Sequence, residues 1–341
     1  MTPKRPDFKM PSSLHPTYTV TEESLTSLAD LWSDPSQRLD WDCLFVLPAW
    51  LNAWWRCFGK EMTPFLRSVR KRNAVIGIAP LMIRGQTAFF MGDAAICDYL
   101  DFVVTPGQEA TFFTALVRDL RGQGIVHLVL DAVRADSAVI RVLADMAAQL
   151  GCRFFADPQG VAMVVDLPKT WDAYLQHLSG KERHEIRRKF RRLREAAAPE
   201  LRIAEKPVEV AKAMDTFVRL FKKNRPDKAA FMTADMSTFF QMMAEALIEI
   251  DIFKLFTVDI ESEPAAAVIC FDYRSCRYLY NNAYNELFAA LSVGLLSKVF
   301  SIRDAIESGL RTYDFLKGDE AYKQRLGGRP LPLYRCRVEL N

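Results

Sequence analysis

The hydrophobic and polar positions along the chain predict an alternation of helices and strands. Between residues 48 and 59, apolar side chains recur at the spacing of one helix face, with Pro48 suited to the first turn and Gly59 to the end. A further helix over 106–121 and an apolar strand over 125–130 follow later. Strand-like apolar runs separated by short polar turns fill the interval between the two helices: 65–69, 74–83, 87–91 and 98–104.

The second half of the chain repeats this order. It shows three strand-like runs, a helix that opens near a glycine, a glycine that stops the helix, and a last strand. The three strand-like runs are 253–259, 265–272 and 277–282, the helix is 292–308, and the last strand is 312–316. We interpret this weak repeat as two copies of one α/β unit, each an antiparallel meander that ends in a βαβ crossover. A further strand over 161–167 and a helical segment over 171–198 lie between the copies.

Length and composition agree with a folded protein of two domains. The chain has 341 residues, of which 50% are hydrophobic, so it can bury two cores. No run reaches the roughly 18 apolar residues that a membrane-spanning helix needs. Residues 1–20 are rich in Pro, Ser and Lys and predict a loose arm, and they lack the apolar stretch of a signal peptide. We therefore expect a cytoplasmic protein.

The cysteines and histidines predict neither disulfides nor a metal site. The seven cysteines are an odd, scattered set without a Cys-x-x-Cys pair, and the four histidines are far apart in the sequence. A disulfide framework needs paired cysteines and a zinc site needs clustered ligands. We expect reduced cysteines and no metal.

The charge is concentrated in one segment. The chain as a whole carries a net charge of only +3, but residues 181–194 hold eight Lys or Arg against two Glu. Ile186, Phe190 and Leu193 lie at i, i+4 and i+7, so the segment predicts an amphipathic basic helix. It is interpreted as a solvated face, as a surface for nucleic acid or a membrane, or as an element that assists ligand-phosphate binding or domain contact. RNA-binding aromatic signatures are absent, so no nucleic-acid partner is expected.

The segment 281–296 is the first candidate binding element. Ser292 suits a helix N-cap, Gly294 permits close approach to the backbone, and the first two turns carry no Asp or Glu. A helix start without its own anion can accept one from a ligand. The alternative is an ordinary helix with a serine cap.

Two further groups of polar residues carry candidate chemistry. Asp319, Tyr322 and Lys323 follow the last strand of the second unit, where α/β sheets place polar chemistry, so they form an acid/base or anchoring cluster or else a solvated turn. Asp98 and Asp101 are carboxylates on either side of Tyr99 and Leu100, but a strand does not pair them for acid/base catalysis. For these two carboxylates we favour structural hydrogen bonding.

Seven short motifs occur in one order along the chain: 47–55, 77–81, 98–102, 181–189, 280–284, 292–296 and 313–323. Together they resemble the CelD/BcsL-type proteins of the GNAT acetyltransferase superfamily over about residues 41–330. The resemblance implies an α/β fold (α+β mixed sheets) of two tandem GNAT-like domains, as in the related Fem-type peptidyltransferases. These would be residues 21–165 and 166–341, the second including the basic helix 181–197 and the acyl-CoA site.

The resemblance also assigns roles to residues. Backbone amides at the helix start would bind the CoA pyrophosphate, in the set Ser292, Val293, Gly294, Leu295 and Leu296. The strand end would contact the pantetheine arm or the acyl carbonyl, through Asn281, Asn282 and Ala283. One glycine stands where the commoner GNAT pattern has two, so an acyl carrier or aminoacyl donor stays open beside acyl-CoA.

The reaction needs a neutral amine, a donor to the oxyanion and an acid for the departing thiolate. Asp319 would orient or deprotonate the amine, and Tyr322 or Tyr284 would donate to the sulfur. The acceptor would be contacted by the set Asp98, Tyr99, Asp101, Lys317 and Lys323.

We thus expect an N-acyltransferase that uses acetyl-CoA or another acyl-CoA, or an acyl carrier protein. Its acceptor would be an amine of a sugar, amino acid or peptide in envelope or exopolysaccharide biosynthesis, a context that rests on the resemblance. The alternative is a non-catalytic GNAT-fold protein whose basic helix binds an acidic partner or contacts a membrane surface.

Overall fold

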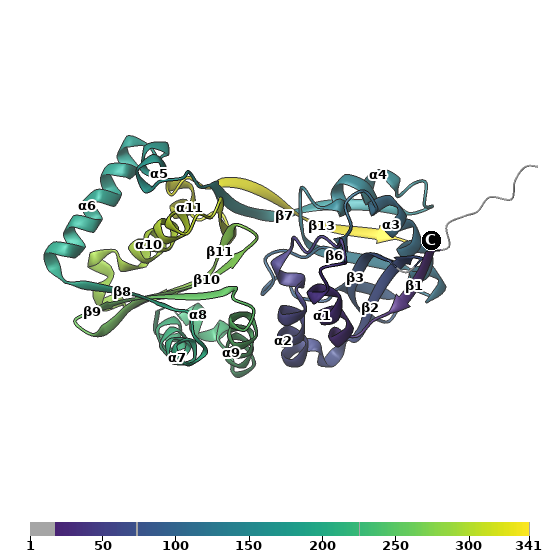
Figure 1. The fold of residues 1–341 in the computed structure, drawn as a ribbon, viewed down its shortest axis with the longest axis horizontal. Coiled ribbons are helices and arrows are strands. Elements are labelled where there is room, and N and C mark those ends of the chain that lie inside the picture. Colours follow the sequence, from purple (N-terminus) through teal and green to yellow (C-terminus); the bar gives the residue numbers. More distant parts are fainter. Residues whose placement is uncertain (1–17, 73, 225, 341) are drawn as a thin grey trace, which may run out of the picture.

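The computed structural model describes residues 18–340 apart from Asn73 and Arg225, and its strands form one mixed sheet. Figure 1 shows two lobes, one from each half of the chain, joined by a two-stranded ribbon. From one edge to the other, the strand order is β1-β2-β3-β4-β6-β13-β7-β12-β11-β10-β9-β8, with β5 paired to β3.

The first lobe contains the N-terminal elements. Its strands are β1 Tyr18–Glu22, β2 Thr63–Lys71, β3 Ala74–Arg84, β4 Thr87–Phe90, β5 Val103–Val104 and β6 His127–Arg134. Its helices are α1 Leu25–Ser33, α2 Pro48–Phe58, α3 Glu109–Gly122 and α4 Ala144–Met146, with short helical turns at Leu44–Val46, Gly59–Glu61 and Val139–Leu143.

The second lobe begins after a long strand, β7 Arg153–Asp166. Its helices are α5 Trp171–His177, α6 Gly180–Ala196, α7 Pro207–Asn224, α8 Pro226–Phe231, α9 Ala234–Ile248, α10 Val293–Glu307 and α11 Ala321–Arg325. Its strands are β8 Pro199–Ala204, β9 Phe253–Ile260, β10 Glu263–Tyr273, β11 Cys276–Tyr284 and β12 Thr312–Lys317, with a 3-10 turn η4 at Glu286–Leu291.

The two lobes repeat one topology, as the sequence predicts. In the first, β2, β3 and β4 are antiparallel, and β4 pairs in parallel with β6 after the α3 crossover. In the second, β9, β10 and β11 are antiparallel, and β11 pairs in parallel with β12 after α10. A parallel pair needs such a crossover, because a tight turn reverses the strand direction.

The last strand, β13 Arg329–Glu339, links the lobes. It runs antiparallel to β7 from Arg329 opposite Val164 to Glu339 opposite Arg153, and its other edge pairs with β6 of the first lobe. β7 also pairs with β12 of the second lobe. The division of the chain at residue 165 stays a prediction, and the C-terminal strand crosses it to complete the sheet of the first lobe.

Aromatic packing holds α2 of the first lobe against the second. The fully buried Trp50 ring makes edge contacts with Phe239 of α9 at 5.5 Å, Phe271 of β10 at 5.7 Å and Tyr280 of β11 at 5.5 Å between ring centroids. Buried aromatic pairs of this kind add to the free energy gained from burial alone. The tryptophan cluster is therefore a core element, as expected from its helical spacing.

Three predictions of local structure were wrong. The expected strand over 98–104 is a strand only at Val103–Val104, because the segment before it is held by the second lobe, as described below. The expected arm extends too far, since Tyr18 already starts β1; residues 1–17 lie outside the described residues. The helical segment 171–198 is broken near Ser179, whose hydroxyl caps α6.

Candidate active site at the junction of the lobes

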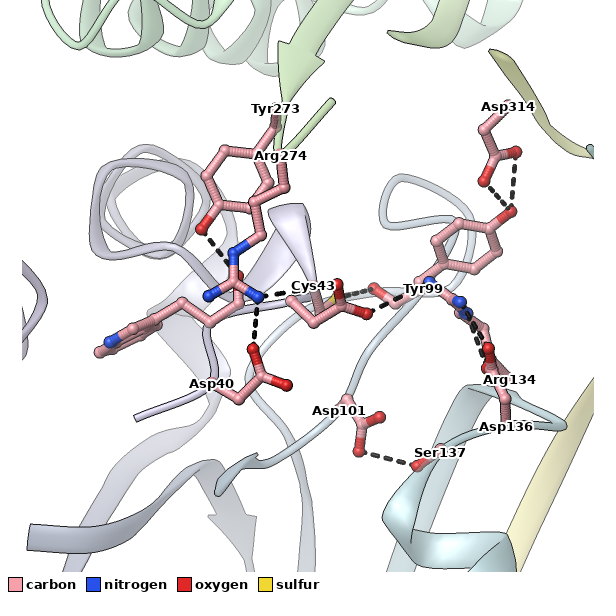
Figure 2. Close-up of polar contacts among 12 residues, drawn as sticks. Asp40, Cys43, Tyr99, Asp101, Arg134, Asp136, Ser137, Tyr273, Arg274 and Asp314 are labelled. Carbon is pink, nitrogen blue, oxygen red and sulfur yellow. Dashed lines mark hydrogen bonds and ion pairs between the residues drawn. The ribbon is translucent and has the colours of Figure 1, made fainter. Parts of the chain in front are cut away.

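The junction segment, residues 91–102, belongs to the first lobe and docks on the second. The backbone N–H of Lys317 donates to Asp98 Oδ1 at 3.0 Å, and the Tyr280 hydroxyl donates to the Ile96 carbonyl at 3.1 Å. The Tyr99 hydroxyl lies 2.9 and 2.8 Å from the two carboxylate oxygens of Asp314, a contact that Figure 2 shows. These contacts replace the hydrogen-bond ladder of a strand, which explains why residues 98–102 do not form the expected strand.

A cavity, which we call the junction cavity, lies where the junction segment meets β11. Its volume is about 400 Å³, and both lobes contribute to it. The lining residues are Ala95, Ile96, Asp98, Phe221, Phe231, Tyr280 and Asn281. The structure thus brings together Asp98, expected at the acceptor, and Asn281, expected at the donor.

Asp98 has the titration behaviour of a base for neutral pH. Burial raises the pKa of its carboxyl to about 7, the Asp314 carboxylate adds to the increase, and the hydrogen bond from the Lys317 amide opposes it. A general base is most effective when its pKa lies near the working pH. A carboxyl with such a pKa in a cavity is a candidate catalytic group.

Asp314 is a buried neighbour that the sequence analysis did not select. Burial raises the pKa of this carboxyl to about 6, while the hydrogen bonds from the Leu316 amide and Tyr99 lower it. It lies in the strand β12 between buried aromatic residues. An acid inside an apolar strand was the signal that could have identified it.

Asp101 faces a different cavity, so it does not pair with Asp98. That cavity, of about 420 Å³, is also lined by Asp40, Tyr99 and Arg134. Asp101 Oδ1 accepts hydrogen bonds from the Ser137 hydroxyl and the Phe102 amide, both at 2.8 Å, and burial raises the pKa of the carboxyl to about 7. The expected role in structural hydrogen bonding agrees with this arrangement.

Ion pairs surround the cavity at Asp101 and link the lobes. Arg134 donates to Asp136 within the first lobe, and Arg274 from the β10–β11 turn donates to Asp40 across the junction. The Tyr273 hydroxyl donates to the Trp41 carbonyl at 2.7 Å. In Figure 2, Asp40, Tyr273 and Arg274 lie to the left of Tyr99, Arg134 and Asp136 lie below it, and Asp314 lies above it.

β11 and β12 separate beside the junction cavity. Their parallel pairing covers only Cys276–Tyr278 against Thr312–Asp314. Past that point β12 is irregular, with Leu316 at φ 59°, while Asn281, Asn282 and Ala283 of β11 keep pairing with β10. The β12 side of these three residues is therefore a strand edge next to the cavity.

The start of α10 follows from the same strand. Ser292 adopts the left-handed conformation, makes no side-chain cap, and accepts a hydrogen bond from Lys189 Nζ at 2.8 Å on its hydroxyl. The first turn carries no acidic residue, as expected. The expected serine cap is thus absent, and a cation from α6 lies at the helix start instead.

Only part of the expected row of amides lacks a backbone acceptor, and Val293 in that part is a buried residue. The N–H groups of Leu295 and Leu296 both donate to the Ser292 carbonyl at 3.0 Å, because they close the first helical turns, and the Ser292 N–H donates to Ala289. Within the described residues, the amides of Val293 and Gly294 have no recorded acceptor. These two N–H groups are the ones able to bind an anion.

Gly294 has a structural reason of its own. A Cβ atom at this position would lie 2.8 Å from Cδ1 of the Tyr284 ring, closer than real contacts allow. We expected Gly294 to leave its backbone open to a ligand. On one side the Tyr284 ring covers this backbone instead. Tyr284, expected as an acid, is packed at the helix start.

Lys298 connects three expected site residues. Its ammonium donates to Asn282 Oδ1 at 3.0 Å and to the Gly294 carbonyl at 2.6 Å, and it lies 4.8 Å from the centre of the Tyr322 ring. Lys298 is buried. Lys298 was not among the predicted site residues, because a lysine in a helical pattern is normally a surface residue.

The turn after β12 does not form the expected cluster. Lys323 is buried, and its ammonium donates to the carbonyls of Leu316, Lys317 and Gly318 and pairs with Glu320, so it is not available to an acceptor. Asp319 is exposed and does not line the junction cavity. Burial raises the pKa of the Tyr322 hydroxyl, which favours its protonated, donating form.

Two features are absent from the part of the chain that the structure describes. It holds no group of three or more His, Cys, Asp or Glu residues arranged to bind a metal ion. In the same residues, no helix has the length and apolar character needed to cross a membrane.

Comparison with known proteins identifies the fold. Residues 180–324 match the family model described as "Acetyltransferase (GNAT) domain". A search of curated proteins finds no match. The CelD/BcsL-type resemblance therefore stays a prediction.

Solved structures are similar over nearly the whole chain. FemX is 13% identical, with 93% of this chain and 96% of that chain covered and a TM-score of 0.64. The C-terminal domain of a putative lysylphosphatidylglycerol synthetase from Agrobacterium fabrum is 12% identical, with 93% and 92% covered and a TM-score of 0.56. A tandem GNAT protein from the clavulanic acid biosynthesis pathway is 13% identical, with 95% and 99% covered and a TM-score of 0.51.

These similarities establish the architecture. The chain is a mixed α/β protein with two tandem GNAT-like domains, in agreement with the repeat read from the sequence. At such low identities the similarity concerns the fold, so the chemistry has to be argued from the site.

Proposed function

We propose that the protein is an N-acyltransferase that moves an acyl group from acyl-CoA to an amine bound in the junction cavity. The observation that carries the proposal is the position of Asp98, a carboxyl with a pKa of about 7, in the same cavity as Asn281 at the edge of β11. One lobe thereby supplies a base and the other supplies the donor site.

The donor site is built on the second lobe. The pyrophosphate would bind the amides of Val293 and Gly294, at a helix start that has no acid and where Lys189, which also pairs with Glu185 at 3.2 Å, donates to Ser292. The pantetheine arm would follow the strand edge at Asn281–Ala283 and place the thioester carbonyl beside the cavity. An acyl group from this direction reaches Asp98 without leaving the junction.

The reaction then needs one proton to be removed and one to be supplied. The amine nitrogen attacks the thioester carbonyl carbon, Asp98 takes the proton from the nitrogen, the new C–N bond forms and the C–S bond breaks. The thiolate leaves with the electron pair of the C–S bond and takes a proton from solvent or from Tyr322. Asp98 returns its proton to solvent, and Tyr322, where it has protonated the thiolate, takes one back from solvent, so the protein is unchanged after each turnover.

Asp98 replaces Asp319 as the proposed base. Asp319 is exposed and outside the cavity, whereas Asp98 lies in it and is held by the Lys317 amide. A base has to be within hydrogen-bonding reach of the proton that it removes. The sequence pattern could not show which loop faces the junction, so it pointed to a carboxylate that lies outside the cavity.

The structural neighbours support transfer chemistry of this kind. One of them is named a putative lysylphosphatidylglycerol synthetase, and another is a tandem GNAT protein of a biosynthetic pathway. The first name indicates an aminoacyl group as the alternative cargo. Acyl-CoA is the donor favoured here because the GNAT match covers the strand, the helix start and Lys298.

A thermal-unfolding panel with acetyl-CoA, a long-chain acyl-CoA and free CoA tests this proposal. At a ligand concentration of 100 times its dissociation constant, binding adds about 2.7 kcal/mol to the free energy of unfolding. Transfer of a radiolabelled acetyl group to an amine should accompany the shift. A protein that is stabilised by none of these ligands would contradict the donor assignment.

The exposed charge of α6 supports one alternative, a non-catalytic protein that binds an acidic partner. Arg187 and Arg192 are exposed, and neither has an ion-pair partner within the described residues. Binding to vesicles with anionic lipid that weakens steeply with salt, in a protein without transferase activity, would favour this alternative.

A further inference from the structure

A second cavity adjoins the junction cavity and has no role in the reaction as proposed so far. Its volume is about 550 Å³, and it shares Ala95, Ile96 and Phe231 with the junction cavity. We propose that it binds the apolar body of the acceptor, so that the substrate is an amine joined to an apolar group of about the size of an aromatic ring. This inference rests on the proposed function, because it places the acceptor nitrogen at Asp98.

Most of the side chains around the second cavity are apolar, and five charged ones also line it: Glu61, Arg84, Asp93, Asp131 and Arg335. The aromatic and sulfur-containing ones include Trp54 and Phe58 of α2, Met82 of β3, Phe89 and Phe90 of β4, and Met236 of α9. Pockets lined in this way bind apolar groups, while a few polar groups fix the orientation. A sugar alone would leave most of this lining without a partner.

Trp54 supplies one such polar group. Its side chain is 3% exposed, and within the described residues its indole N–H has no hydrogen-bond partner. The neighbouring Trp50 differs, because its indole N–H donates to Cys97 Sγ at 3.3 Å. Buried donors are normally paired. We assign the N–H of Trp54 to an oxygen or nitrogen atom on the apolar body of the acceptor, whose binding has to shift the indole because its nitrogen is fully buried.

The lining also decides between the two substrates. None of the residues around the second cavity belongs to β9, β10, β11, β12 or α10, which form the donor side. Instead, the junction segment lines both cavities, with Ala94 and Leu100 in the second, Ala95 and Ile96 in both, and Asp98 in the junction cavity. A molecule with its nitrogen at Asp98 extends along this segment, so its occupant is the acceptor rather than the acyl chain.

Two matched amines and one cavity-filling variant test the inference. Acetyl transfer from acetyl-CoA is measured with ethylamine and with phenethylamine, and the ratio of their kcat/KM values is compared between proteins. The different basicities of the two amines cancel in this comparison. Ala94→Phe should lower kcat/KM for phenethylamine relative to that for ethylamine by at least about tenfold, because the new ring occupies the space for the substrate ring.

The control is Ala211→Phe, which adds the same ring to an unrelated cavity between α2, α7 and α9. It should leave the ratio unchanged. Retained transfer to ethylamine shows that each variant is folded. An equal ratio in wild type and Ala94→Phe, with ethylamine still acetylated, would overturn the inference and leave the proposed function standing. Transfer to neither amine by the wild type would contradict both.

A second variant keeps the test valid if Ala94→Phe does not fold. Tyramine adds one hydroxyl group to phenethylamine, and the Trp54 N–H should donate to that oxygen. Wild type should prefer tyramine by a factor of about 2 to 10, and Trp54→Phe should abolish the preference while still accepting phenethylamine. A preference that survives in Trp54→Phe would remove Trp54 from the site.

Discussion

The two lobes share a topology and differ at the start of the crossover helix. In the first lobe, α3 carries Glu109 in its first turn, and in the second, α10 carries no acid there while Lys189 donates to Ser292 at its start. A carboxylate at a helix start already uses the positive end of the helix. This difference supports the proposed donor site on the second copy.

The lobes also differ in what lies beneath that helix. In the first, the Phe112 ring lies against Gly77, so closely that a Cβ there would be 2.3 Å away, and Phe102 and Phe113 pack around it. In the second, the corresponding region holds Asn282 and Lys298. The two lobes therefore differ in character at this place. The first has an apolar core, and the second has polar groups that we propose contact a ligand.

The largest expected effect comes from removing the base that the first lobe provides. Asp98→Asn should lower kcat/KM by about 10² to 10⁴, because the amine proton loses its acceptor. In the wild type, activity should rise with pH through about 7 as Asp98 ionises, and this part of the rise should be absent from the variant. Initial rates between pH 5.5 and 8.5 measure both effects.

Asp101→Asn is the matched control for that experiment. It makes the same substitution three residues away, at a carboxyl that lines the other cavity. Its pH profile should keep the rise near pH 7. If the two variants lose activity equally, the assignment of the base to Asp98 fails.

The next effect concerns the donor site of the second lobe. Gly294→Leu should weaken acetyl-CoA binding by roughly 100-fold or more, since the new side chain displaces Tyr284 and covers the amides of Val293 and Gly294. Calorimetric titration measures it. Gly122→Leu at the end of α3, where a Cβ meets no atom within 4 Å, should bind acetyl-CoA normally.

A smaller effect is expected for the cation at the helix start. Lys189→Ala should weaken acetyl-CoA binding about 3- to 10-fold at low salt, and the difference should shrink as salt rises. Arg187→Ala, on the exposed side of α6, is the comparison. Equal dissociation constants for the two variants would show that α6 acts as a general positive surface rather than through Lys189.

The smallest effect is a change in stability with pH. The folded-state pKa of Asp101 is about 7 against an ordinary value of 3.8, so its contribution to stability is present below about pH 4 and is lost as pH rises through 7. Asn at this position keeps an oxygen for Ser137 and Phe102 and cannot ionise. Relative to wild type, Asp101→Asn should gain about 1 kcal/mol in unfolding free energy between pH 4 and 8, a value reduced for partial exposure. Urea unfolding at pH 4 and at pH 8 measures the free energies of unfolding of both proteins. A difference between variant and wild type that is the same at both pH values would contradict the prediction.

The fold was predictable where local pattern decides it. Pro48 and Gly59 bracket α2 as expected, and the two-residue turns at Glu261–Ser262 and Arg274–Ser275 separate β9, β10 and β11. These elements depend on neighbours in the sequence. The pairing of β13 with β6 depends on residues about 200 positions apart, and no local pattern indicates it.

The candidate site was predictable only in part, for the same reason. Asn281 and Asp98 were both selected, but their meeting in one cavity requires the junction segment to leave the strand conformation. Long-range contacts, such as Tyr99 with Asp314, impose that change. Lys298 and Asp314 were missed because burial, rather than residue type, gives them their importance.

The central claim is that one lobe binds the donor and the other does not. Titration of acetyl-CoA into the wild type and into Gly294→Leu, followed by isothermal calorimetry, tests it most directly. The account predicts one molecule bound per wild-type chain and none detectable in the variant at the same concentrations. Two molecules per chain, or unchanged binding in Gly294→Leu, would contradict it.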